Sequence, residues 1–155
     1  MKSYYKALDH YRKLYRTGGS RMISIVQDDK FSWLIDGYCA HKIPNDEMEL
    51  NPNIFQPFRG DLSAIIEKAE SGESLFETGL IKKNCIKTLI PFVSKGEKPF
   101  TIWFSKGLLD TFQIDFMTLK GTSPLEPAAV QVRGITAGII LPCRNSSNDD
   151  ISLYI

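Results

Sequence analysis

The first twenty residues repeat apolar side chains at helical spacing. Over residues 2–16 the apolar positions recur at every third or fourth residue, and at about 100° per residue they share one narrow face. These positions are Tyr4, Leu8, Tyr11 and Tyr15. The basic side chains fall opposite this face or on its flank, and Gly18-Gly19 then ends the pattern. The stretch therefore predicts an amphipathic helix with an aromatic side and a basic side.

Short alternating or β-branched runs predict strands in two groups. The first group lies at 22–26, 31–35 and 38–43, with turn signals at Asp28-Asp29 and Asp36-Gly37. The second group lies at 100–104, 112–116, 129–133 and 138–141, separated by turns or loops at 105–107 and 121–127.

Two further helices are predicted between these groups. A short helix is expected at 62–69, within a linker over 44–80, and Asp61 stands where a helix cap belongs. A second long helix is expected at 81–95, because Cys85, Leu89 and Val93 share one face at helical spacing. Pro91 would kink or shorten that helix.

The order of elements predicts an α+β protein in which a helix-plus-antiparallel-sheet unit occurs twice. The two half-repeats cover about 1–43 and 81–144 of a single domain over 1–144, and a polar tail follows at 145–155. If the halves pack side by side, both long helices lie on one side of the sheets.

The composition is that of a globular domain with its own core, with 155 residues of which 43% are hydrophobic and 24% charged. No apolar run reaches the roughly 18 residues of a membrane span, so no membrane partner is expected. Three widely spaced cysteines, Cys39, Cys85 and Cys143, are expected to be reduced thiols of a cytoplasmic protein.

Charge is distributed unevenly although the net charge is +1. Residues 1–21 hold six basic side chains against Asp9, and residues 78–98 hold five lysines against Glu97. Two basic stretches on an otherwise acidic chain predict contact with a polyanion, through phosphates and with strong salt dependence. The residues expected to contact a duplex DNA backbone are Lys2, Lys6, Arg12, Lys13, Arg16, Arg21, Lys82, Lys83 and Lys87.

Two short motifs resemble parts of a known family. Leu34-Ile35-Asp36-Gly37-Tyr38-Cys39-Ala40 is similar to the A-T-D-G-x-R-L/M-A stretch of bacterial DNA polymerase III β subunits, the sliding clamps, with Cys39 at the arginine position. The run 126–133 followed by 137–144 is similar to the end of clamp proteins, which close on V-L-M-P-M-R. Leu141, Pro142 and Arg144 match that closing motif, and Cys143 replaces a methionine.

The resemblance implies a DNA-clamp-like domain whose helices carry basic side chains over DNA. It also implies a hydrophobic groove for short peptides of replication or repair proteins, marked here by Leu141, Pro142, Cys143 and Arg144. Clamp protomers hold three such domains and dimerise into a six-domain ring. This chain has room for one domain, so it forms a homo-oligomer of six copies or no ring.

The tail itself resembles a clamp-binding peptide. Asp150-Ile151-Ser152-Leu153-Tyr154 is similar to the motif Gln-Leu-Ser/Asp-Leu-Phe without its glutamine. The hypothesis is that Ile151, Leu153 and Tyr154 dock in a groove on a neighbouring copy or on a host clamp. The alternative is a frayed terminus with a few chance apolar residues.

Signals for catalysis or metal binding are sparse. His10 and His41 are the two histidines, and no paired Cys/His spacing typical of zinc is present. No glycine-rich phosphate loop precedes a helix. Cys39 and His41 share a strand face, which leaves a small hydrolase as the weakest reading. We therefore predict no catalytic residue, metal or cofactor, and Asp36 is expected to bind the backbone amides of its turn.

Aromatic residues on the predicted strands have two interpretations. They could form a base-stacking platform for single-stranded nucleic acid, but alternation within strands favours core packing. The residues concerned are Trp33, Phe100, Trp103, Phe104, Phe112 and Phe116.

These patterns predict a non-enzymatic, sliding-clamp-like protein that binds duplex DNA, replication proteins, or both. The alternative is a clamp-fold interaction module that binds or inhibits a host clamp or another replication protein without encircling DNA.

Overall fold

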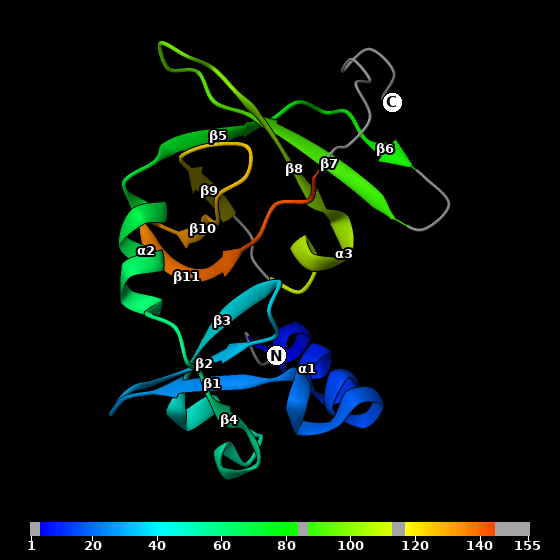
Figure 1. Cartoon of the computed structure of the whole chain (residues 1–155), viewed down its shortest axis with the longest axis vertical. Helices are drawn as coiled ribbons and strands as arrows, with labels where there is room; N and C mark the ends of the chain where they lie inside the picture. Colours follow the sequence, from blue (N-terminus) through cyan, green and yellow to red (C-terminus); the bar gives the residue numbers. More distant parts are fainter. Residues whose placement is uncertain (1–3, 84–86, 113–116, 145–155) are drawn as a thin grey trace.

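The computed structural model describes residues 4–83, 87–112 and 117–144 (Figure 1). It is a mixed α+β structure built around one large sheet. The helices are α1 (Tyr5–Gly18), α2 (Leu62–Glu70) and α3 (Lys106–Leu109), with 3₁₀ turns η1 (Gly19–Met22), η2 (Asn45–Glu47) and η3 (Pro52–Ile54). The strands are β1 (Ser24–Gln27), β2 (Phe31–Ile35), β3 (Cys39–Pro44), β4 (Gln56–Pro57), β5 (Glu73–Glu77), β6 (Lys82–Lys83), β7 (Thr88–Val93), β8 (Thr101–Ser105), β9 (Met117–Gly121), β10 (Ala128–Val132) and β11 (Ile135–Ile140).

The sheet runs in the order β4-β1-β2-β3-β11-β10-β9-β5-β7-β6, and β8 pairs with β7. Strand β5 pairs with β9 through its first residues and with β7 through its last, so it forms the corner of the sheet. Phe92 of β7 and Phe104 of β8 therefore pack over Val130 of β10 and Ile140 of β11 in one core.

The N-terminal and C-terminal parts of the sheet join where β3 meets β11. Three residue pairs, Cys39–Ile140, Ala40–Ile139 and His41–Gly138, form this junction. Gly138 is required there, because a β-carbon would strike the Ala40 carbonyl oxygen and the Phe112 ring.

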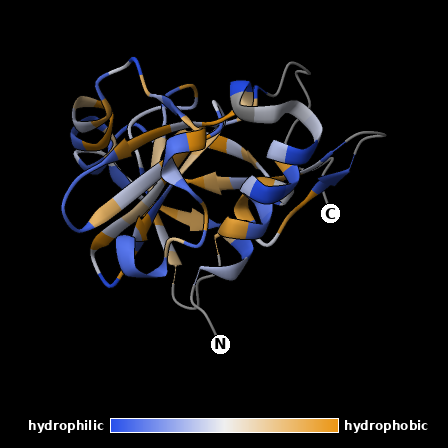
Figure 2. Ribbon diagram, turned by 90° about the horizontal axis from the view of Figure 1, so that it is seen from below, coloured by the Kyte–Doolittle hydropathy of each residue, from blue (hydrophilic) through white to orange (hydrophobic). Residues whose placement is uncertain are grey.

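Helices α1 and α2 cover opposite faces of the sheet because side chains alternate along β2. Leu34 packs with Leu8 and Tyr11 of α1. Its neighbours Trp33 and Ile35 pack instead with Leu62 of α2. Figure 2 shows hydrophobic segments on the strands inside and hydrophilic segments on the helices and turns around them. Among the described residues, no helix is long and apolar enough to cross a bilayer.

Several predicted elements are confirmed. The N-terminal helix buries Leu8 and Tyr11 as its periodicity requires. The first three strands and the short helix also form, and the Asp61 carboxylate accepts the Ala64 amide proton at 3.0 Å as the predicted cap. Core packing is confirmed for four of the strand aromatics, namely Trp33, Trp103, Phe104 and Phe112. Phe116 lies outside the described residues.

The predicted second long helix at 81–95 is wrong. Its described residues form β6 and β7, and β7 pairs with β8 from Leu89 to Val93. Pro91 lacks the amide that a helix interior needs, and Thr88 and Ile90 are β-branched residues that favour a strand. Positions 85, 89 and 93 are four residues apart, and that spacing places them on one face of a strand as well as on one face of a helix.

The expectation of two half-repeats with both long helices on one side is therefore also wrong. The described residues contain one long helix, α1, and α2 lies on the opposite face of the sheet. The supposed linker holds the corner strand β5, and the expected strand 112–116 falls largely outside the described residues.

Candidate functional site

The four residues predicted to mark a peptide groove line one surface cavity of about 550 Å³. Leu141, Pro142, Cys143 and Arg144 follow β11 directly. The remaining lining residues are Tyr38, Lys87, Leu89, Ser105 and Leu108. The cavity thus combines the closing segment of the described chain with the β2–β3 turn, β7 and α3.

Two backbone hydrogen bonds hold this segment in place. The Leu141 amide donates to the Tyr38 carbonyl at 2.8 Å, and the Cys143 amide donates to the Trp103 carbonyl at 2.8 Å. The segment therefore spans from the β2–β3 turn to the outer edge of β8. Tyr38 is 61% exposed and lines the same cavity.

The cavity has a positive rim. Lys87 and Arg144 are both exposed, and none of the described residues that line it is acidic. An apolar floor with cationic groups at its edge favours a ligand that carries apolar side chains beside a carboxylate.

The basic residues do not gather on one surface as expected. Lys6, Lys13, Arg16 and Arg21 are exposed along α1 and η1, whereas Lys82 and Lys83 lie on β6 at the opposite end of the molecule (Figure 1).

Some of this positive charge has an acidic partner. Arg12 pairs with Glu49 at 2.6 Å, and Lys13 pairs with Asp9 at 3.0 Å. Lys2 and the tail residues Ile151, Leu153 and Tyr154 lie outside the described residues.

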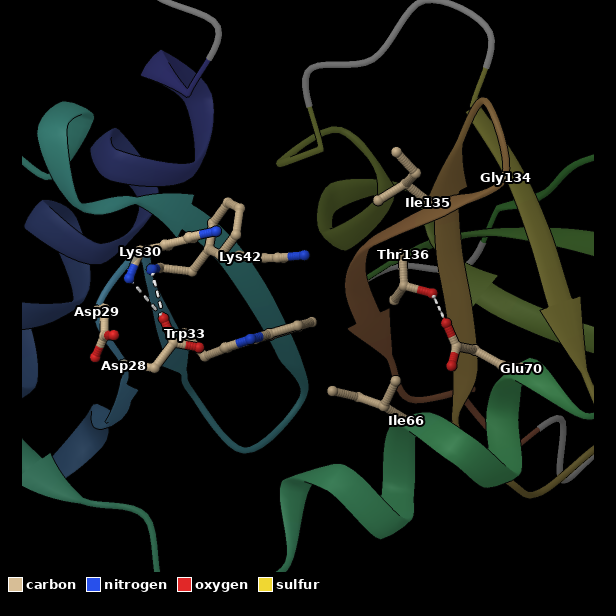
Figure 3. Close-up of a pocket in the computed structure, with 11 residues that line it drawn as sticks. Asp28, Asp29, Lys30, Trp33, Lys42, Ile66, Glu70, Gly134, Ile135 and Thr136 are labelled. Atoms are coloured by element: carbon tan, nitrogen blue, oxygen red, sulfur yellow. Dashed lines mark hydrogen bonds between the residues drawn. The ribbon is translucent and has the colours of Figure 1, made fainter.

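A larger cavity of about 810 Å³ opens where β3 and β11 diverge beyond their junction (Figure 3). One wall carries Lys30 from the β1–β2 turn, Trp33 of β2 and Lys42 of β3. On the other wall Glu70 of α2 accepts a hydrogen bond from Thr136. Asp28 and Asp29 lie beside Lys30 on the first wall, so both walls carry acidic groups and the charge of the cavity selects no single ligand class.

A buried polar cluster between α1 and β3 is the feature that sequence reasoning missed. Each member has a defined partner, beginning with His10 Nε2 at 2.6 Å from Asp36 Oδ2 and Cys39 Sγ at 3.4 Å from the same oxygen. His41 Nδ1 lies 2.8 Å from the Tyr11 hydroxyl, and His41 Nε2 lies 2.8 Å from Thr111 Oγ1. The His41 ring also stacks on Phe112 with centroids 4.2 Å apart.

The turn Asp36–Cys39 places part of this cluster. Gly37 adopts a positive φ of 91°, which the tight turn between β2 and β3 requires. Asp36 Oδ1 accepts the amide protons of Tyr38 and Cys39, both at 2.7 Å, which confirms the predicted turn role of this aspartate. Asp36 Oδ2 is left to face His10 and Cys39.

Burial and hydrogen bonding together determine the charge states in the cluster. Burial raises the pKa of the Cys39 thiol far above its ordinary value, and Asp36 adds to the effect. Burial also lowers the pKa of His41 to about 3. For Asp36, burial opposes ionisation, but hydrogen bonds from His10 and from two backbone amides outweigh it and lower the pKa. At neutral pH the cluster therefore holds a carboxylate, a neutral imidazole at His41 and a thiol.

The sequence held one signal for this cluster, the spacing Asp36-x-x-Cys39-x-His41. That spacing does not show that His10, 26 residues before Asp36, packs against the Asp36 carboxylate. Comparisons of the chain with protein-family models, curated proteins and solved structures find no match.

Proposed function

We propose that the protein is a non-enzymatic interaction module that binds a short acidic and apolar peptide segment of a partner protein. The observation that carries this proposal is the cavity beside residues 141–144. All four residues to which the clamp resemblance points line it, together with an exposed aromatic ring and two cations. A peptide with one or two large apolar side chains next to an aspartate complements that surface.

The position of the two motifs supports a relation to sliding clamps. The stretches 34–40 and 137–144 are far apart in sequence, yet β3 pairs with β11 and the Leu141 amide binds the Tyr38 carbonyl. Tyr38 of the first stretch and residues 141–144 of the second line the same cavity, which supports the proposal that the two motifs belong to one functional unit. Partners of the replication and repair class follow from this relation.

The buried thiol argues against the hydrolase reading. Cys39 is 3% exposed, and the raised pKa of its thiol keeps it protonated. A nucleophilic cysteine needs an accessible thiolate, so this arrangement suits structure or ligation rather than attack on a substrate.

The test is binding of a synthetic peptide with the sequence of residues 147–155, labelled with a fluorophore and followed by anisotropy. It contains Asp149-Asp150-Ile151 and Leu153-Tyr154, the combination that the cavity favours. We expect saturable binding to the full chain. Leu141→Asp and Arg144→Glu should each weaken it at least tenfold, about 1.4 kcal/mol.

Two controls make this result specific. Arg59→Glu changes an exposed cation outside the cavity lining and should leave binding unchanged. A peptide with both aspartates replaced by asparagine should bind the wild type more weakly than the original peptide does. The two peptides should bind Arg144→Glu equally. Absence of saturable binding, or equal loss in Arg59→Glu, would refute the proposed groove.

A second candidate function is contact with the phosphates of duplex DNA through α1 and η1. Exposed Lys6, Arg16 and Arg21 favour it. We expect the double variant Lys6→Glu/Arg16→Glu to lose at least tenfold in duplex affinity at low salt, with Arg59→Glu as the matched control. A plot of the logarithm of the binding constant against the logarithm of the salt concentration should have a slope of about −0.9 per phosphate contacted. Salt-independent binding would contradict this reading.

A further inference from the structure

We propose that His10, Asp36 and Cys39 bind a Zn²⁺ ion at the contact between α1 and the β2–β3 turn. One ligand-type atom from each residue, a ring nitrogen, a carboxylate oxygen and a sulfur, lies within 4.8 Å of the other two. These residues come from one helix, one turn and the start of one strand, so two separate parts of the fold converge here.

The separations suit a tetrahedral ion. Zinc binds oxygen and nitrogen at about 2.0 Å and sulfur at about 2.3 Å, which puts neighbouring ligand atoms about 3.3–3.6 Å apart. Cys39 Sγ and Asp36 Oδ2 already stand 3.4 Å apart. His10 Nε2, now 2.6 Å from the same oxygen, needs to withdraw by about 0.7 Å to reach that range.

His10 has the freedom to make this move. Its side chain is 19% exposed, whereas that of Asp36 is 4% exposed, so the imidazole forms the solvent side of the cluster. An ion can therefore enter past His10, and water can occupy the fourth coordination position, as at zinc sites with three protein ligands.

The donor set selects zinc over the common hard cations. Magnesium and calcium take oxygen ligands, whereas a sulfur and an imidazole nitrogen are typical of zinc. Binding releases the Cys39 thiol proton to solvent, and the Asp36 carboxylate is already ionised. The two anions then cancel the charge of the ion, so the loaded site carries no net charge in a buried region.

A second shell is already in place. Asp36 Oδ1 is fixed by two backbone amides, which leaves Oδ2 as the ligand oxygen. Thr111 donates to the Leu108 carbonyl at 2.6 Å, so its oxygen accepts the Nε2 proton of His41. His41 Nδ1 then carries no proton, so it adds no hydrogen bond to the Cys39 thiolate 3.9 Å away, and the supporting bonds are those of the two amides on Asp36. Such supporting hydrogen bonds are usual around metal ligands.

The experiment uses the full chain after removal of bound metal with EDTA and dialysis. Titration with Co²⁺ should produce a thiolate-to-cobalt charge-transfer band, and Zn²⁺ should abolish it with one ion bound per chain by calorimetry. Cys39→Ser should eliminate the band. His10→Gln and Asp36→Asn should each weaken Zn²⁺ binding at least tenfold, with circular dichroism confirming the fold of each variant.

Cys143 provides a matched control. Cys143→Ser should keep both the band and the stoichiometry, because Cys143 does not belong to the cluster. His10→Gln tests the site even if Cys39→Ser fails to fold, since His10 lies partly exposed on α1. A band that persists in Cys39→Ser, a band lost in Cys143→Ser, or no uptake of Zn²⁺ by the wild type would overturn the proposal. None of these outcomes depends on the peptide groove.

Discussion

His41 shows how one residue can define the interior of this protein. The run from the Leu34 carbonyl through Tyr11, His41 and Thr111 to the Leu108 carbonyl contains four close polar contacts. The hydroxyls of Tyr11 and Thr111 and a neutral His41 imidazole supply three protons for these four contacts. The fourth contact is satisfied only if His41 is protonated, but burial opposes that charge more strongly than the missing hydrogen bond favours it.

This balance predicts a pH dependence of stability in metal-free protein. The unfolded chain protonates His41 near pH 6.5, but the folded chain does so only near pH 3. The contribution of His41 to the free energy of unfolding is therefore complete above pH 6.5. It is lost by about 1.4 kcal/mol per pH unit as the pH falls below that value. Urea unfolding of wild type and His41→Gln between pH 7 and 4 should give curves that converge. Parallel curves would mean that His41 is not held neutral.

Thr111 is the second residue on which this network depends. Thr111→Val leaves the buried Nε2 proton of His41 without an acceptor, which should reduce the free energy of unfolding by about 1–3 kcal/mol. Thr17→Val is the matched control, because the Thr17 hydroxyl is exposed and serves carbonyls of its own helix. Denaturant unfolding measures both. An equal loss in the two variants would show that the His41 contact contributes nothing.

At the scale of elements, the sequence predicts structure best where apolar residues keep one spacing, helical or strand-like, over a long run. Helix α1 repeats its pattern over three turns, and the Asp61 cap marks α2, so both follow from local chemistry. In the run at 81–95 the apolar positions span only 85 to 93 and fit both periods, and pairing with β8 decides the structure. The corner strand β5 is mostly exposed with one buried side chain, Leu75, so it carries little periodic signal.

The same distinction between local sequence and packing of distant segments applies to the candidate sites. The family resemblance points to residues 141–144 together because they form one contiguous motif, and all four line one cavity. The His10–Asp36–Cys39 cluster arises from the packing of α1 on β3, a contact that no spacing within the sequence encodes.

The β3–β11 junction gives a prediction for an element. Gly138→Ala should destabilise the protein by about 1–3 kcal/mol, because the new β-carbon meets the Ala40 carbonyl and the Phe112 ring. Gly107→Ala in α3 is the control, since its nearest neighbour is Ser105 Oγ at 3.6 Å. That change should be neutral or stabilising by up to about 1 kcal/mol. Thermal unfolding compares the two, and equal melting temperatures would contradict the close approach at Gly138.

At the scale of the whole molecule, the groove and the tail predict self-association. If the tail of one copy fills the cavity of another, light scattering should give a mass above 17.5 kDa that rises with concentration. Deleting residues 148–155, or introducing Leu141→Asp, should restore the mass of one chain. Arg59→Glu should not change it. A monomer at all concentrations would show that the tail does not join copies, while leaving peptide binding from other proteins to its own test.

The order of the strands in space has a consequence for synthesis on the ribosome. One hydrophobic cluster draws all its buried members from residues 7–55, so it can pack while the rest of the chain is still being made. Strand β11 is the last strand in the described chain, yet it lies between β3 and β10 in the middle of the sheet. Until it emerges, both neighbours present unpaired edges, which are the surfaces most prone to join another chain. Prematurely ended products that lack β11 should therefore aggregate, although their first cluster is complete.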